Sequence, residues 1–218
     1  MRLYRRLLLT ATVLAFAVIA LGAYVRLSDA GLGCPDWPGC YGKATPFGAH
    51  GEIHAEASAN PQGPVTVFKA WVEMIHRYVA TALGLIIIAL VWLAVREGRS
   101  TDARRPTDAR AGTASIGLAV FTLAWVILQG LFGMWTVTLR LQPAVVTAHL
   151  LGGVLLFALL LMQANRVGVH PVVSPGAFRY RGWARAALAL VFVQIALGGW
   201  VSSNYATLAC QDFPTCQG

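Results

Sequence analysis

Charged residues are scarce in this sequence. Asp, Glu, Lys and Arg make up 12% of its 218 residues, and hydrophobic residues make up 57%. Because soluble domains carry about 25% charged residues, this composition excludes an ordinary soluble domain and indicates an integral membrane protein. Acidic residues are the scarcest, nine against 17 basic ones. The net charge of +8 would suggest a nucleic-acid partner only in a soluble protein, and we expect none here.

Five apolar stretches are long enough to cross a bilayer, which takes about 20 residues. The first follows a basic start, as the core of a cleaved signal peptide would, but it is longer than a typical signal core. We therefore expect it to be retained as a helix, and we expect the fold to be all-α. The five predicted spans lie near Leu7–Val25, Glu73–Val95, Ser115–Val137, Val145–Ala164 and Trp183–Ser203.

Arginines alternate from side to side along the chain. They gather at the amino terminus and after the second and fourth spans, whereas the loops after the first and third spans hold few. Because basic residues accumulate on the cytoplasmic side, we predict a cytoplasmic amino terminus and a periplasmic loop after the first span. The predicted location is the inner (plasma) membrane of a bacterium.

Two segments of the chain are copies of each other. Residues 20–42 and 196–218 align without a gap at an offset of 176, and 11 of 23 residues are identical. Each copy contains a C-x5-C pair, Cys34 with Cys40 and Cys210 with Cys216. On an oxidising face, such a pair is either a structural disulfide that closes a small loop or a redox-active one. The spacing does not suit a zinc finger.

Ionisable residues inside a membrane span are costly and mark candidate functional sites. The segment "WVEMIHRYVA" contains Glu73 and His76, which share a helix face, and Arg77, which points about 100° away from His76. In "PAVVTAHLLGG", His149 is the only ionisable residue of its span. Both spans enter from the outer side, so each histidine is predicted to lie roughly 9 Å below that interface.

Two histidines at equal depth in an apolar bundle can ligate one metal centre from opposite sides. Bis-imidazole ligation of a haem iron suits this arrangement, whereas zinc would need further ligands at that depth. The alternative is a pair of interior histidines with hydrogen-bond partners. Arg77 either snorkels to the interface or pairs with a haem propionate. Glu73 is either a solvated helix-start carboxylate or a group for proton transfer.

Other features carry weaker predictions. His50 and His54 lie four apart in "HGEIHAE", where they would form a metal pair only on a helix, and that loop shows no firm helical period. His170, on the inner side, is expected to be solvated. Four glycines in the third and fifth spans are expected to permit close helix packing: Gly130, Gly133, Gly198 and Gly199.

Three segments resemble the haem A synthase family, membrane enzymes of cytochrome oxidase assembly: "GAYVRLSDAGLGCPDWPGCYG", "WVEMIHRYVATALG" and "LQPAVVTAHLLGG". The resemblance covers nearly the whole chain in order. It implies an eight-helix protein of two similar four-helix halves. It implies that a methyl group of haem O is oxidised to the formyl group of haem A through successive hydroxylations, with a bound haem b as redox cofactor.

The resemblance also implies roles for individual residues. Glu73 matches the family's catalytic carboxylate. His76 and His149 match the histidine pair of the first half, which is the site for the substrate haem. Cys34 and Cys40 match the family's outer-loop cysteine pair, which is linked to haem transfer or redox function.

The predicted architecture is a four-helix transmembrane bundle (1–165), then an inner loop, a fifth span and the start of a second half (166–218). The family's last three helices, with the histidine pair that holds haem b, have no counterpart here, so we expect a truncated form. Expected partners are haem O, haem A and lipid, with haem O synthase, oxidase assembly factors and a second copy of the chain as further candidates. The alternative function is a non-catalytic bis-histidine cytochrome b or haem carrier.

Overall fold

The computed structural model describes residues 2–101, 115–168, 175–206 and 209. Helices joined by loops make up these residues, with no β-strand among them. The long helices are α1 (Arg2–Leu27), α3 (Val67–Thr101), α4 (Ile116–Thr138), α5 (Pro143–Arg166) and α6 (Arg181–Ser203). All five are long and apolar enough to cross a membrane. The predicted all-α, multi-pass membrane fold is therefore confirmed. Three residues singled out from the sequence lie outside the described residues: His170, Cys210 and Cys216.

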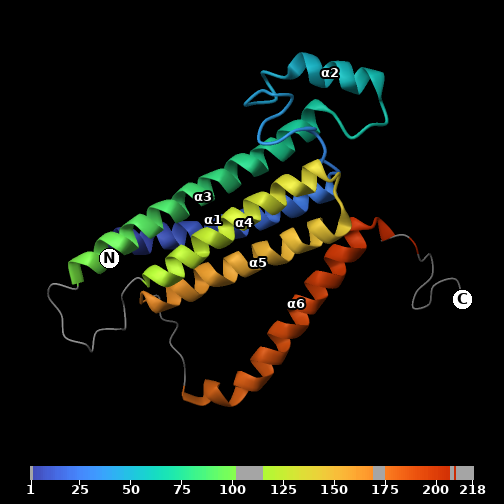
Figure 1. Ribbon diagram of the computed structural model, residues 1–218. Helices are drawn as coiled ribbons and strands as arrows, with labels where there is room; N and C mark the ends of the chain where they lie inside the picture. Colours follow the sequence, from blue (N-terminus) through green and yellow to red (C-terminus); the bar gives the residue numbers. More distant parts are fainter. Residues whose placement is uncertain (1, 102–114, 169–174, 207–208, 210–218) are drawn as a thin grey trace, which may run out of the picture.

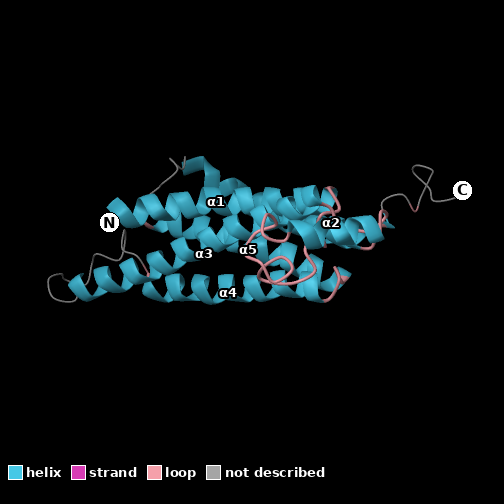
Figure 2. Ribbon diagram, turned by 90° about the horizontal axis from the view of Figure 1, so that it is seen from above, coloured by secondary structure: helices cyan, strands magenta, loops and turns pink. Residues whose placement is uncertain are grey.

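Two short helices add to the predicted spans. The first is α2 (His50–Ala59), which lies in the loop between α1 and α3, beyond the start of α3 (Figure 1). The second is a 3-10 helix, η1 (Pro175–Tyr180), directly before α6. Seen from above, α2 and the loops around it gather at one end of the bundle (Figure 2). The loop between α1 and α3, the predicted outer loop, is thus a folded cap rather than a simple connection.

Four of the long helices form a closed ring. The helices α1 and α4 each pack against both α3 and α5, and the four run side by side along the molecule (Figure 1). This set of neighbours places α3 diagonally opposite α5. Residues on their inward faces therefore point at each other across the interior of the bundle.

The tightly buried core lies in the half of the ring that contains the start of α1. On α1, Tyr4, Leu8, Ala11 and Ala15 are buried, and their alternating spacing of four and three residues puts them on one helix face. Small residues on this face let neighbouring backbones approach closely, as in other helix packing in lipid. Facing members of the same core are Leu83, Ile87, Leu90, Ala94, Ala119, Leu156, Leu160 and Ala164.

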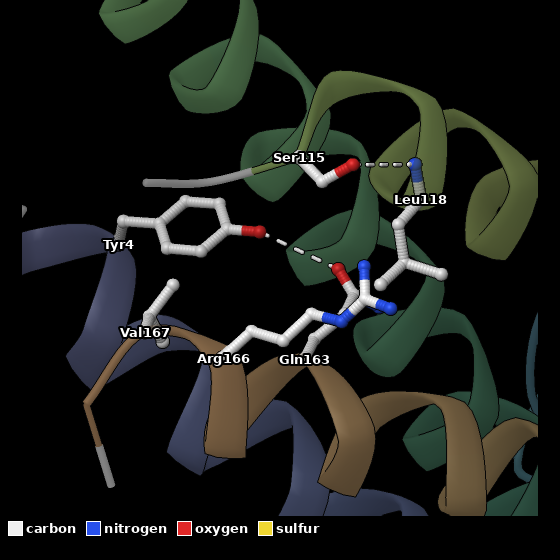
Figure 3. Close-up of a pocket in the computed structure, with 6 residues that line it drawn as sticks. All are labelled: Tyr4, Ser115, Leu118, Gln163, Arg166 and Val167. Carbon is white, nitrogen blue, oxygen red and sulfur yellow. Dashed lines mark hydrogen bonds between the residues drawn. The ribbon is translucent and has the colours of Figure 1, made fainter. Parts of the chain in front are cut away.

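A small polar network joins three helices at this same end. The hydroxyl of Tyr4 donates to Gln163 Oε1 at 3.4 Å, and Gln163 Nε2 donates to Thr122 Oγ1 at 2.8 Å. Beside them lies a cavity of about 10 Å³, which is at the lower limit for one water molecule. Figure 3 shows Tyr4 and Gln163 pointing toward each other at its edge. Buried hydrogen bonds of this kind link transmembrane helices that gain little from the hydrophobic effect.

The fifth long helix, α6, leaves the ring at an angle and approaches α5 near one end (Figure 1). There Gly199 packs so closely that an added Cβ would lie 2.9 Å from Leu150 Cδ2. Ser203 Oγ lies 3.4 Å from Thr147 Oγ1. Close helix packing, the prediction for Gly199, is confirmed. Gly130 and Gly198 have no atom within 4 Å of an added Cβ, so for these two the packing prediction is wrong.

The two copies of the repeat touch each other at the carboxyl-terminal end of α6. The guanidinium of Arg26 donates to the backbone oxygen of Ser202 and lies 4.1 Å from the ring centroid of Tyr205. The hydroxyl of Tyr205 lies 3.3 Å from Asp29 Oδ1. Arg26 and Ser202 are equivalent positions of the repeat, and so are Asp29 and Tyr205. Contacts between equivalent positions are a property of residues close to a two-fold axis.

Candidate functional site

His76 and His149 come from the diagonally opposed helices α3 and α5. These two helices face each other across the interior of the ring. Both residues are half-buried, and the Nδ1 atom of each ring is buried with no hydrogen-bond partner among the described residues. The two histidines predicted to work together are therefore brought together.

A glycine makes room for each of these imidazoles. A Cβ on Gly22 of α1 would lie 3.1 Å from His76 Cε1, and a Cβ on Gly133 of α4 would lie 3.5 Å from His149 Cε1. The two halves of the ring thus have the same construction, with an imidazole resting on the glycine of a neighbouring helix. Gly133 was expected to let helices pack, and its close approach to His149 of α5 agrees with that prediction. The sequence pattern does not predict this role for Gly22, although the repeat pairs it with Gly198.

These residues fit a metal centre with two imidazole ligands. Interior histidines kept for stability would have hydrogen-bond partners, since buried polar atoms are nearly always paired, and both Nδ1 atoms lack one. Among the described residues, no three His, Cys, Asp or Glu side chains gather as a metal site. A zinc ion would need such a set, whereas a haem iron takes its other four ligands from the porphyrin and needs only two from the protein.

Glu73 lies one turn before His76 on α3 and is 3% exposed. Its Oε2 accepts a hydrogen bond from the backbone N–H of Cys34 at 2.9 Å, and its Oε1 pairs with the guanidinium of Arg77. Because α3 begins at Val67, Glu73 lies inside the helix rather than at its start. The alternative of a solvated helix-start carboxylate is therefore wrong.

Arg77 binds the outer loop as well as Glu73. Its Nη1 donates to the backbone oxygens of Asp36 at 2.8 Å and Gly39 at 2.7 Å, with a longer contact of 3.3 Å to Pro38. The guanidinium is thus held by protein groups and does not snorkel. Glu73 and Arg77 are four residues apart, which is the spacing of a helical ion pair. This spacing is visible in the sequence and predicts the pair. The pairing of Arg77 with a haem propionate stays a prediction.

The loop held by Arg77 is closed by a disulfide between Cys34 and Cys40, with an S–S distance of 2.07 Å. The prediction of a disulfide for this pair is confirmed. Both cysteines are fully buried and pack with Ile53 of α2 and Met74 of α3. We call residues 34–40 the disulfide loop. It is attached to α3 through Glu73 and Arg77, directly next to the turn that carries His76.

His50 and His54 were the weak metal candidates of the outer loop. They lie on α2 with Nε2 atoms 3.1 Å apart, and both are exposed. The sequence pattern does not predict this helix. Ile53 is its one buried residue, so the helix lacks the periodic apolar positions by which an amphipathic helix is recognised. The pair lies in the cap and is not part of the His76–His149 site.

A family model described as cytochrome oxidase assembly protein matches residues 5–218. The chain belongs to this family. Its relatives in the family include the heme A synthase of Shewanella oneidensis, which is 44% identical over 210 residues, or 94% of this chain. The heme A synthase of Symbiobacterium thermophilum is 31% identical over 234 residues, or 100% of this chain.

A more distant member of the family, the heme A synthase of Halalkalibacterium halodurans, is 27% identical over 208 residues, or 92% of this chain. The chain spans 59% of the Shewanella relative, 65% of the Symbiobacterium relative and 60% of the Halalkalibacterium relative. No solved structure gives a significant match. The family membership predicted from the three motifs is confirmed.

Proposed function

We propose that this chain binds haem O between His76 and His149 and acts in its oxidation to haem A. The observation that carries the proposal is the pair of half-buried imidazoles on diagonal helices, each with an unpartnered Nδ1 atom. The names of the relatives, heme A synthase, support the same substrate and an oxidoreductase activity. A non-catalytic cytochrome or haem carrier would use the same two histidines and becomes one outcome of the test below.

The chain's own residues position the haem and shield it from water. His76 and His149 would hold the iron of the bound haem, each through one imidazole nitrogen. The bound haem O would supply the peripheral methyl group that is to be oxidised. The apolar helices around the pair keep bulk water away from the macrocycle. The disulfide loop covers this site from the outer side, since it is fixed to α3 by Glu73 and Arg77.

Glu73 is proposed as the catalytic carboxylate. It lies one turn from His76 on the same helix and is buried, which is where a group for proton transfer is needed. In the structure the carboxylate holds Arg77 and the N–H of Cys34. We propose that these bonds hold the carboxylate beside the haem site, where it would position the reacting group or serve in proton transfer.

Haem b, the redox cofactor implied by the family, is proposed to bind elsewhere. Among the described residues, His76 and His149 are the only histidines in the ring of helices, and they are assigned to the substrate. We derive no step through haem b. We propose that residues 1–165 are a complete substrate-binding half and that 166–218 begin the equivalent second half, as the repeat indicates.

The proposed orientation follows the arginines. The amino terminus faces the cytoplasm and the disulfide loop faces the periplasm of a bacterial inner membrane, where disulfides persist. This orientation would place the site's cap on the outer side. Haem O synthase, oxidase assembly factors and a second copy of the chain are proposed as partners.

The test is chromatography of haems extracted from membranes of cells that make haem O and this chain. The same experiment is run on the full-length Shewanella relative, with the matching glutamate changed. We expect haem A with the unchanged relative, and bound haem O without haem A when its matching glutamate becomes Ala. We expect the chain itself to bind haem O, with or without Glu73. Haem bound by the unchanged relative without any haem A would overturn the synthase activity and leave a carrier. Undiminished haem A in the variants would overturn the role of Glu73.

A further inference from the structure

The helix α2 carries a pair of exposed histidines that the proposed function does not use. His50 and His54 are one helical turn apart, so both project from the same side of α2. Their ring centroids lie 4.2 Å apart, and their Nε2 atoms lie 3.1 Å apart. The pair is therefore already in contact before any ligand is present.

This spacing is that of two ligands on one metal ion. Imidazole nitrogens bind Zn²⁺ or a similar ion at about 2.0–2.1 Å. At this bond length, a nitrogen–nitrogen separation of 3.1 Å corresponds to a ligand–metal–ligand angle of about 98°. Square-planar and octahedral sites require about 90° and tetrahedral sites about 109°. We propose that His50 and His54 form a chelating site for a divalent transition-metal ion on the outer face of the protein.

The scaffold holds the two ligands in place. Ile53, which lies between them in the sequence, is fully buried and packs with Cys34 and Cys40. The end of α2 is closed by a bond from Asn60 N–H to the oxygen of Glu56 at 2.9 Å. Because the helix is anchored to the disulfide loop, binding does not first have to order a free segment.

The charge around the pair favours a cation. The helix α2 contains Glu52 and Glu56 and no lysine or arginine. Glu52 is exposed next to the histidines in sequence, and a nearby carboxylate raises the local concentration of cations. The described residues contain no third His, Cys, Asp or Glu that joins the group, so water or an incoming ligand completes the coordination.

The chemistry of the ligands predicts which ions bind. Imidazole suits Cu²⁺, Ni²⁺ and Zn²⁺, whereas Mg²⁺ and Ca²⁺ prefer oxygen ligands. The general order of affinities places Cu²⁺ first. We therefore expect binding of Cu²⁺ to be the tightest, binding of Ni²⁺ and Zn²⁺ to be weaker, and no binding of Mg²⁺ or Ca²⁺ at this site.

The alternative explanation for the 3.1 Å separation is a hydrogen bond between one neutral imidazole and the other. That arrangement needs both rings but no metal. It predicts that both histidines contribute to the stability of α2 in the presence of a chelator, whereas the metal site predicts that their contribution appears when the ion is added.

The experiment titrates the purified chain, in lipid nanodiscs, with Cu²⁺ and with Zn²⁺. Calorimetry counts the ions bound, and electron paramagnetic resonance of Cu²⁺ reports nitrogen ligands. The variants are H50Q, H54Q and the double variant. The matched control is H170Q, which removes a histidine elsewhere in the chain.

We expect the double variant to lose one Cu²⁺ per chain, and each single variant to bind it at least about tenfold more weakly, because a chelating second ligand acts at high effective concentration. Hydrogen exchange of α2 should slow when Cu²⁺ is added to the unchanged chain and to H170Q only. Equal Cu²⁺ stoichiometry and affinity in the double variant and in H170Q would overturn the site. Haem content serves as an independent readout and should be the same in all four variants.

Discussion

The carboxylate of Glu73 accepts a hydrogen bond from the backbone N–H of Cys34 at 2.9 Å. This contact joins a membrane helix to a disulfide loop 39 residues earlier in the chain. The same carboxylate binds Arg77, which holds the other side of that loop. The geometry of the cap and the position of the proposed catalytic group are therefore set by one cluster of bonds.

Replacing Glu73 with Ala should destabilise the protein. The change leaves the guanidinium of Arg77 buried without its counter-charge and the N–H of Cys34 without its acceptor. Removal of one partner of a buried pair costs about 3–5 kcal/mol. Thermal unfolding in nanodiscs measures the loss, with Glu52→Ala on the exposed face of α2 as the control, which should change stability by less than about 0.5 kcal/mol. Equal melting temperatures for the two variants would refute this account of Glu73.

Adding a methyl group beside each histidine should have unequal effects on haem binding. In Gly22→Ala the new Cβ would lie 3.1 Å from His76 Cε1, so the imidazole must move, whereas in Gly133→Ala the contact with His149 is an ordinary 3.5 Å. We expect about tenfold weaker haem binding in Gly22→Ala, a shift of about 1.4 kcal/mol, and a smaller change in Gly133→Ala.

Gly130→Ala serves as the control for that series, because an added Cβ there meets no atom within 4 Å. Haem titration followed by the visible absorption band gives the affinity of each variant. If Gly130→Ala and Gly22→Ala weaken binding to the same extent, the glycine contacts do not shape the site.

An added methyl group should destabilise the contact between α4 and α5 at Gly152, whereas the next residue, Gly153, should tolerate one. A Cβ on Gly152 would occupy the space of the Gln129 side chain, whereas a Cβ on Gly153 would make only a 3.8 Å contact with Ile19. Overpacking of this kind costs about 1–3 kcal/mol. The free energies of unfolding of Gly152→Ala and Gly153→Ala, measured by denaturation, should therefore differ by that amount. Equal stability of both variants would contradict the packing described.

Opening the disulfide should loosen the cap without unfolding the ring of helices. Closing a loop as short as 34–40 is worth about 2 kcal/mol, and its loss also frees the carbonyls that Arg77 binds. Hydrogen exchange of residues 34–43 should accelerate in the variant with both Cys34→Ser and Cys40→Ser. Exchange in the middle of α4 should stay as it is. Unchanged protection of residues 34–43 would show that the disulfide does not hold the loop.

Much of this architecture is readable from the sequence. Apolar runs of membrane length and the alternation of arginines predict the five spans, because lipid leaves a chain few other choices. The motif residues His76 and His149 could be paired from their similar distance to the ends of their spans. A C-x5-C pair on an oxidising face predicts the disulfide of Cys34 and Cys40.

The rest depends on how the outer loop folds. The hydrogen bonds from Arg77 to Asp36 and Gly39 join parts of the chain about 40 residues apart. The sequence around these residues does not predict them. The helix α2 buries only Ile53, so its hydrophobic pattern carries no signal. The contacts of Gly22 with His76 and of Gly133 with His149 depend on which helices become neighbours. The sequence pattern does not show this, and for Gly133 it predicted only close helix packing.

The most direct test of the central claim is the visible spectrum of the purified chain loaded with haem, compared with those of His76→Ala and His149→Ala. Two imidazole ligands on one iron predict a low-spin, bis-histidine spectrum for the unchanged chain and loss of that spectrum in each single variant. His50→Ala, on α2, should keep it. A bis-histidine spectrum that survives in either His76→Ala or His149→Ala would contradict the claim that these two residues hold one haem between α3 and α5.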